Sequence, residues 1–198
     1  MNSILLRRFH RVLGGLDDRA YLLAKISYEV APTSFGIKPS SLLSFHSYSR
    51  KLRQIWDQYK NDVCKELNIN YFELNKTAKH TLVLFYHHDV LEKTVQDPNN
   101  KAFLEKMGYE SELKLEQILG MLQRKMGSIF PHEIGLLLGI PRKDIVGFIT
   151  NNGADCLFCG YWKVYHNPEQ ADSLFQGYDR AKNHVLRRLF AMRGAVSA

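Results

Sequence analysis

The pair Cys156 and Cys159 is the feature of this sequence that lies closest to known chemistry. Two thiolates separated by two residues can share one soft metal ion or form a reversible disulfide. A tetrahedral metal site needs about four ligands, so His166, His132 or Cys64 would have to complete it, or a second subunit would. The redox-active cysteine pair of thioredoxin-like proteins lies where a strand leads into a helix, whereas Cys156 and Cys159 precede a predicted strand. The alternative is a structural pair of thiols packed in a turn, because free cysteine is often buried.

His132 and Glu133 begin a predicted helix, in an order that resembles the start of a zinc-protease motif. That chemistry requires a second histidine four residues after the first, on the same helix face, and position 136 is a leucine. Two interpretations stay open. The carboxylate of Glu133 could stabilise the helix N-terminus through the helix dipole, or the two side chains could face a ligand together.

Two other segments carry side chains suited to a small anionic or planar ligand. Lys38 lies among hydroxyl residues in the loop 36–41, which could hold a phosphate, although the loop lacks the spacing of a nucleotide-binding loop. Alternation along a predicted strand places Tyr161, Lys163 and Tyr165 on one side and apolar residues on the other. The tyrosine and lysine side could stack against a planar redox cofactor such as a flavin or a tetrapyrrole.

These side chains must be positioned by a combination of helices and short strands, which hydrophobic spacing predicts. The helices are predicted over residues 16–30, 50–67, 91–95, 101–106, 111–126, 131–138, 141–150 and 168–189, and the strands over 42–48, 71–74, 81–87 and 161–165. This order predicts an α+β fold in a single domain over 1–198, with a helix-rich C-terminal half. We expect a small mixed sheet of about three to five strands covered by helices, and a loosely attached helix within 1–15.

Two packing predictions follow from these elements. Trp56 lies on the apolar stripe of the helix 50–67 and should be buried against the sheet. The connection 141–155 is short and should fold back as one helix and a turn, so His132 should lie within reach of the segment 156–165.

The chain has a net charge of +7 and a sequence pI of about 9.3, which makes anions its expected partners. Nucleic acid, phosphate esters and acidic membrane surfaces all fit this charge. The basic residues gather near 7–11, 50–53 and 180–193. Each cluster could equally be the solvated face of a helix, because surface charge is the usual role of lysine and arginine. The aromatic and basic alternation of RNA-binding sheets is not found.

Composition also bears on the compartment. With 45% hydrophobic and 24% charged residues, the chain has the composition of a globular protein rather than a disordered one. No apolar run approaches the ~20 residues that cross a bilayer, and no apolar stretch of a secretory signal follows the first arginines. Three cysteines without an export signal favour reduced thiols and a cytoplasmic location.

Two long motifs, at 130–149 and at 156–165, resemble the signature of DUF3793, an uncharacterised bacterial family known only as a domain of unknown function. Residues 31–40 and 103–109 are similar to further parts of that family, so the resemblance covers about 20–190. The resemblance implies no reaction. It implies proximity to flavodoxin-type and ferrous-iron-uptake genes, and thereby redox or iron physiology. This chain departs from the family pattern at His87, where an arginine is expected, and at Ile140, where an aromatic residue is expected.

Three functional hypotheses result. The first is a cytoplasmic binding or accessory protein of redox or metal (iron) physiology, with a metal ion or planar cofactor held by Cys156, Cys159, His132 and the strand 161–165. The second is an enzyme acting on an anionic or phosphorylated small molecule through Lys38, His132, Glu133 and Lys163. The third is a nucleic-acid-binding protein that uses its basic helices.

Overall fold

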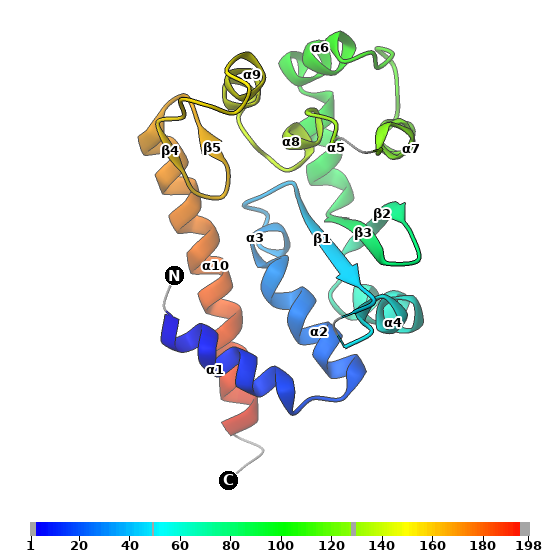
Figure 1. The fold of residues 1–198 in the computed structure, drawn as a ribbon, viewed down its shortest axis with the longest axis vertical. Coiled ribbons are helices and arrows are strands. Elements are labelled where there is room, and N and C mark those ends of the chain that lie inside the picture. The colour runs from blue at the N-terminus through cyan, green and yellow to red at the C-terminus, as the bar shows by residue number, and fades with distance from the viewer. Residues whose placement is uncertain (1–2, 49, 128–129, 195–198) are drawn as a thin grey trace.

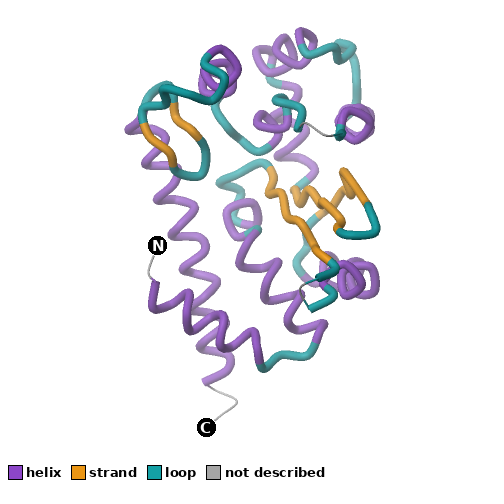
Figure 2. The backbone as a smooth tube through the Cα atoms, viewed as in Figure 1, coloured by secondary structure: helices purple, strands orange, loops and turns teal. Residues whose placement is uncertain are grey.

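The computed structural model describes residues 3–48, 50–127 and 130–194 of the chain (Figure 1). Helices dominate, and they surround a small group of strands (Figure 2). The elements in chain order are α1 (Ser3–Gly14), α2 (Asp18–Glu29), α3 (Ala31–Ser34), β1 (Ser40–His46), α4 (Leu52–Glu66), β2 (Asn70–Lys76), β3 (His80–Tyr86), α5 (His88–Gln96), α6 (Pro98–Lys106), α7 (Leu115–Lys125), α8 (Ile134–Leu137), α9 (Arg142–Thr150), β4 (Phe158–Cys159), β5 (Lys163–Val164) and α10 (Pro168–Gly194). The predicted α+β class and helix-rich C-terminal half are confirmed.

The centre of the fold is a three-stranded sheet in the order β1-β3-β2. Strands β2 and β3 form a hairpin through residues 77–79, and β1 pairs with the other side of β3. Both pairings are antiparallel, so the sheet is not the mixed sheet expected. For β2 and β3 the reason is local, because strands joined by a tight turn are antiparallel.

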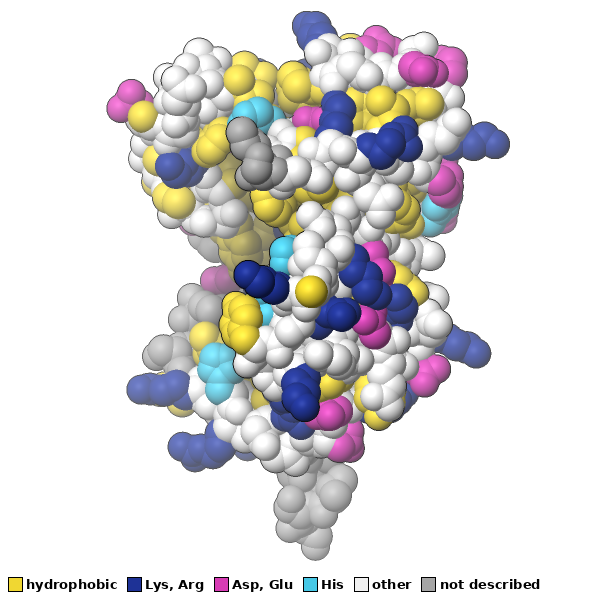
Figure 3. All heavy atoms as spheres, turned by 45° about the vertical axis from the view of Figure 1, so that its right-hand side comes forward, with side chains coloured by type: hydrophobic (Ala, Val, Ile, Leu, Met, Phe, Trp, Pro, Cys, Tyr) yellow, Lys and Arg dark blue, Asp and Glu magenta, His cyan; other side chains and the backbone are white. Residues whose placement is uncertain are grey.

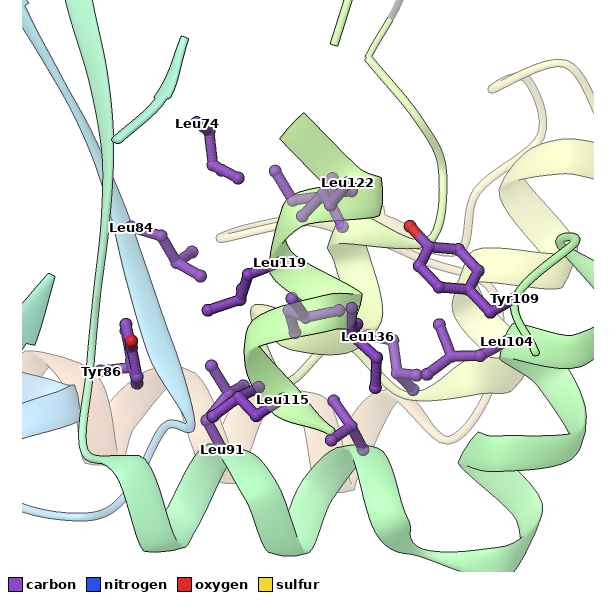
Figure 4. Packing of buried hydrophobic residues seen from close by; sticks show 14 of the residues in the cluster. Leu74, Leu84, Tyr86, Leu91, Leu104, Tyr109, Leu115, Leu119, Leu122 and Leu136 are labelled. Atoms are coloured by element: carbon purple, nitrogen blue, oxygen red, sulfur yellow. The ribbon is translucent and has the colours of Figure 1, made fainter. Parts of the chain in front are cut away.

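Helices cover both faces of this sheet. Residues alternate along β3, so Leu82 and Leu84 point to one face while Val83 and Phe85 point to the other. The first face packs on α5, α7 and α8 (Figure 4). The second face packs on α2 and α4. The strand β3 is therefore buried on both sides, as a continuous apolar run requires.

Trp56 of α4 is completely buried under the second face, which confirms the prediction for that helix. Its ring stacks on Phe45 of β1, with 4.8 Å between ring centroids and 4° between ring planes. The indole Nε1 donates a hydrogen bond of 2.8 Å to the Glu73 carboxylate. The one polar atom of the side chain thus has a partner, the half-buried Glu73 at the edge of the core, as buried tryptophan requires.

The long helix α10 runs along α2 and α3, and α1 crosses its C-terminal half (Figure 1). Phe9 and Leu13 of α1 are only 2% and 5% exposed, in a cluster shared with α2 and α10. The first helix therefore packs against α2 and α10 by its apolar side, and how loosely it is attached stays a prediction. No described helix combines the length and the apolar character needed to cross a bilayer.

The second half of the chain differs in detail from the predicted elements. The expected strand 161–165 is shortened to β5, because the backbone N–H groups of Tyr165 and His166 are bonded to Asp144 instead of a strand. The expected helix 131–138 is reduced to the single turn α8. The surface has an indentation at about mid-height on the left of Figure 3, and apolar side chains are exposed in it.

Candidate functional site

A pocket of about 260 Å³ lies where the two long sequence motifs meet. Most of its wall is apolar. The lining residues are Phe130, Pro131, His132, Ile134, Gly135, Leu138, Ile140, Asp144, Ile145, Phe148, Trp162 and Lys163. An apolar cavity with a few polar groups is the usual form of a small-molecule site, and this cavity is our candidate functional site.

The wall formed by α8 and α9 depends on two glycines. A Cβ atom on Gly135 would lie 3.2 Å from the side chain of Ile145, so the glycine allows the two helices to approach closely. Gly139 has a φ of +75° in the turn that joins the helices, a conformation that other residues rarely adopt. These two positions bring Ile145 and Phe148 of α9 next to the helix turn that follows His132.

Asp144 joins α9 to the β4–β5 hairpin. Its carboxylate is buried and accepts hydrogen bonds from Trp162 Nε1 at 2.8 Å, Tyr165 N at 2.9 Å and His166 N at 2.8 Å. These N–H groups compensate the buried charge. Because the indole N–H is used in this way, Trp162 presents an apolar ring to the pocket. Asp144 is therefore a positioning residue, whose charge is already satisfied within the protein.

His132 and Lys163 are the polar side chains at the open side of the pocket, and both are exposed. The His132 ring centroid lies 5.8 Å from that of Phe148, and Lys163 Nζ lies 6.0 Å from the same ring centroid. Lys163 Nζ also donates to the Gly153 carbonyl oxygen at 2.7 Å, which fixes the position of the ammonium group. The expected proximity of His132 to the segment 156–165 is thus present at Trp162 and Lys163.

Glu133 does not share the site of His132. Its side chain is buried, and Oε1 accepts hydrogen bonds from Lys125 Nζ at 2.8 Å and from the Tyr109 hydroxyl at 3.2 Å. It makes no side-chain cap at the start of α8. The carboxylate instead connects α7 with Tyr109, in the segment after α6, and it is directed away from the ligand site that was expected to include both His132 and Glu133.

Lys38 lies elsewhere, next to α10, and does not line the pocket. Its Nζ is 5.8 Å from the centroid of the Tyr178 ring. Burial, and to a lesser degree the charge of Lys182, lower the pKa of Lys38 to about 8. The hydroxyl groups of the neighbouring Ser40 and Ser41 are buried and bonded inside the protein, so they are not presented to a phosphate.

The three residues of the expected Tyr161, Lys163 and Tyr165 platform contact different parts of the protein. The Tyr161 hydroxyl donates to Asp179 of α10 at 2.7 Å. Tyr165 packs against Gly147 of α9, and its buried hydroxyl has no described hydrogen-bond partner. Lys163 alone of the three lines the pocket. The apolar side of the strand is as predicted, since the residues between these three are buried in the core.

The cysteines are free thiols with different exposure. Cys64 is buried, Cys156 is half-buried and Cys159 is exposed. Within the described ranges there is no group of three or more His, Cys, Asp or Glu side chains that could hold a metal ion. Cys156 and Cys159 therefore have no further ligands of these types arranged around them in the described part of one chain.

Sequence reasoning missed most of the pocket wall. Asp144, Ile145, Phe148 and Trp162 belong to the recognised motifs, but no ligand role was assigned to them. The sequence signal available for these residues was their helical or strand spacing. That spacing indicates burial in the core and does not distinguish a core residue from one that lines a pocket. Asp144 in addition lies in the first turn of α9. An acidic residue at that position is normally explained by its favourable interaction with the helix dipole, so it gives no sign of a role in a site.

Comparison with known proteins agrees with the resemblance described above. No curated protein and no solved structure matches the chain. The sequence profile of DUF3793, described as a protein of unknown function, matches residues 26–195. Both motifs that form the pocket lie inside this range. Since the match covers most of the sequence, the chain belongs to the DUF3793 family.

Proposed function

We propose that this protein binds a small, planar, largely apolar molecule that carries an acidic group. The observation that supports the proposal is the pocket between α8, α9 and β5, with its aromatic wall and its basic opening. Phe148 and Trp162 offer ring surfaces, which favour flat apolar ligands. His132 and Lys163 offer N–H donors and Lys163 adds a positive charge, which favour a carboxylate, sulfonate or phosphate on the ligand.

The environment of Lys163 strengthens this assignment. Its ammonium group has three N–H donors and uses one of them on the Gly153 carbonyl, which orients the charge without neutralising it. Asp144, the acidic residue of the lining, is buried and committed to three N–H donors. The opening of the pocket is thus electropositive, in agreement with the net positive charge of the chain.

The experiment is a fluorescence titration with anilinonaphthalene sulfonate, an aromatic anion with a flat naphthalene ring that brightens in apolar surroundings. We expect saturable binding to the native protein. Aromatic carboxylates are then screened for displacement of the probe and for thermal stabilisation, since a ligand at 100 times its Kd stabilises by about 2.7 kcal/mol.

Variants locate the binding. Lys163→Met and His132→Ala should each weaken probe binding about tenfold, because each removes a charge-assisted or polar contact worth about 1.4 kcal/mol. The matched controls are Lys106→Met and His88→Ala, whose side chains lie outside the pocket lining and should leave binding unchanged. Equal affinity in the pocket variants and in the controls would contradict the proposal.

The other hypotheses receive less support. A single site for an enzyme would need Lys38, His132, Glu133 and Lys163 together, and only His132 and Lys163 line the pocket. The redox or metal role rests on the cysteine pair, for which no further ligand is arranged within the described chain. The cytoplasmic location stays a prediction from the cysteine content.

A further inference from the structure

The excess positive charge of this chain is concentrated at its two ends. Residues 1–16 and 180–198 contain eight of the 27 lysines and arginines and none of the 20 acidic residues. The rest of the chain is therefore close to neutral. Surface charge scattered for solubility would not separate in this way, so the separation calls for a structural explanation.

The fold brings these two ends together, because α1 crosses the C-terminal half of α10 (Figure 1). The Arg8 guanidinium carbon lies 4.5 Å from the centroid of the Phe190 ring, and Phe190 follows Arg187 by one helical turn. Arg8 thus lies against α10 about one helical turn from Arg187. The exposed basic side chains of the two stripes are Arg7, Arg8, His10 and Arg11 of α1 and Arg180, His184, Arg187 and Arg188 of α10.

We propose that this surface binds the phosphate backbone of a nucleic-acid duplex without regard to sequence. We name it the terminal arginine face, and it consists of Arg7, Arg8, Arg11, Arg180, Arg187 and Arg188. Guanidinium groups match phosphate oxygens through paired N–H donors. The stretch 180–188 of α10 extends ~12 Å at 1.5 Å per residue, and a duplex carries one charge per ~1.7 Å of its axis, so several phosphates face it at once.

The position of the two helices explains why the binding would be independent of sequence. Both lie along the body of the protein, where their arginines can follow a backbone. Sequence reading normally requires a helix or strand that enters a groove. Phosphate contacts alone give affinity and orientation without base discrimination.

A nucleic-acid duplex fits this surface better than an anionic membrane does. A helix that lies on a bilayer inserts its apolar side among the lipids. The apolar side of α1 is already used, since Phe9 and Leu13 are buried against α2 and α10. What α1 presents to its surroundings is mainly its basic side.

The terminal arginine face is separate from the pocket proposed above. The β4–β5 hairpin, which carries Trp162 and Lys163, packs on Phe175 and Tyr178 in the N-terminal half of α10. Arg187 and Arg188, the pair changed in the test below, lie in its C-terminal half, and Arg180 lies next to its midpoint. Failure of one proposal therefore leaves the other unaffected.

The test measures binding of a fluorescently labelled random-sequence DNA duplex to the full chain by anisotropy, from about 50 to 200 mM salt. With about five phosphates contacted, the logarithm of affinity should fall with the logarithm of salt with a slope of roughly −4 to −5. Arg187→Glu with Arg188→Glu should lower affinity at least about tenfold and reduce the slope by about 2.

The control is Lys93→Glu with Lys106→Glu, which changes the net charge equally at exposed positions on α5 and α6. It should change affinity less than about twofold, since these lysines make no phosphate contact. Arg7→Gln with Arg11→Gln is a milder second variant, which tests the face even if the first pair disturbs folding. An equal loss in the control pair would overturn the proposal, as would binding to phosphatidylserine vesicles without binding to the duplex.

Discussion

Single residues in this protein acquire their character from what surrounds them. Glu133, next to an exposed histidine in sequence, is buried in an ion pair with Lys125. Asp144 is buried as well, with its carboxylate held by three N–H groups. Charged side chains are almost never fully buried without such partners, so both are elements of the scaffold.

Trp56→Ala should lower the free energy of unfolding by about 3–5 kcal/mol, because it removes a fully buried indole. Trp56→Phe should cost less, since it keeps a ring against Phe45 while it removes the N–H partner of Glu73. Urea denaturation of both variants measures the difference. Equal losses would show that neither the stacking nor the size of the ring matters.

Lys38 should give the protein a distinct dependence on pH. Because burial lowers its pKa from 10.5 to about 8, the folded protein holds fewer protons here than the unfolded chain between those two pH values. This group therefore makes the free energy of unfolding rise with pH across that window, whereas below about pH 8 its full penalty applies. Lys38→Met should be more stable than the parent protein at neutral pH, and the difference should shrink as the pH rises.

Urea denaturation at several pH values measures this effect for Lys38→Met. The exposed Lys106→Met serves as the control and should show a difference that does not vary with pH. A stability difference for Lys38→Met that stays constant through the window would show that the lysine is not desolvated.

The three thiols should react at different rates. Cys159 is exposed and should react readily with a thiol reagent in the native protein. Burial raises the pKa of Cys64 to about 12, so Cys64 should react only after denaturation. Thiol titration of Cys156→Ser, Cys159→Ser and Cys64→Ser assigns each rate. A disulfide between Cys156 and Cys159 under mild oxidation would restore the redox hypothesis.

At the scale of elements, the pocket depends on how α9 and the β4–β5 hairpin meet. Neither element is long enough to be stable alone, because short helices and two-stranded hairpins are marginal in water. Their contact is fixed by Asp144 on one side and by the close approach of Gly147 to Tyr165 on the other.

Gly147→Ala should destabilise the protein by about 1–3 kcal/mol through overpacking. A Cβ atom at this position would lie 2.6 Å from Cβ and Cγ of Tyr165, atoms too near the backbone to move aside freely. Gly120→Ala on α7 is the control, where the nearest atom is 3.8 Å away and alanine should stabilise the helix. Thermal unfolding of the two variants should therefore shift in opposite directions.

At the scale of the whole molecule, the two terminal helices close one end of the fold around a shared cluster. Phe9 lies 4.8 Å from the Tyr28 ring, between centroids, and joins α1 to α2 and α10. The same arrangement gathers the basic residues of both ends. Docking of α1 and formation of the terminal arginine face are thus one structural event.

Phe9→Ala should cost about 3–5 kcal/mol and should make the segment before α2 sensitive to protease. Phe35→Ala is the matched control, because this phenylalanine is 48% exposed and should matter less. Urea denaturation and limited proteolysis measure the two effects. Unchanged stability in Phe9→Ala would mean that α1 is attached only loosely after all.

Features that depend on local residue patterns can be predicted from the amino-acid sequence alone. The helix stripe that buries Trp56, the strand β3 and the α+β class all follow from the types and spacing of neighbouring residues. The family followed from two long motifs. The antiparallel pairing of β2 and β3, by contrast, depends on the turn at 77–79. The spacing of hydrophobic residues does not predict the direction in which two strands pair.

Which side chains share a site depends instead on how the helices and strands pack together. His132 and Glu133 are adjacent in sequence, yet one faces the pocket and the other an internal lysine. His132 and Lys163 are distant in sequence, yet both lie against Phe148. The physical reason is that their convergence depends on the left-handed turn at Gly139 and on the buried hydrogen bonds of Asp144. Such long-range contacts are set by the packing of whole elements and leave no periodic signal in the chain.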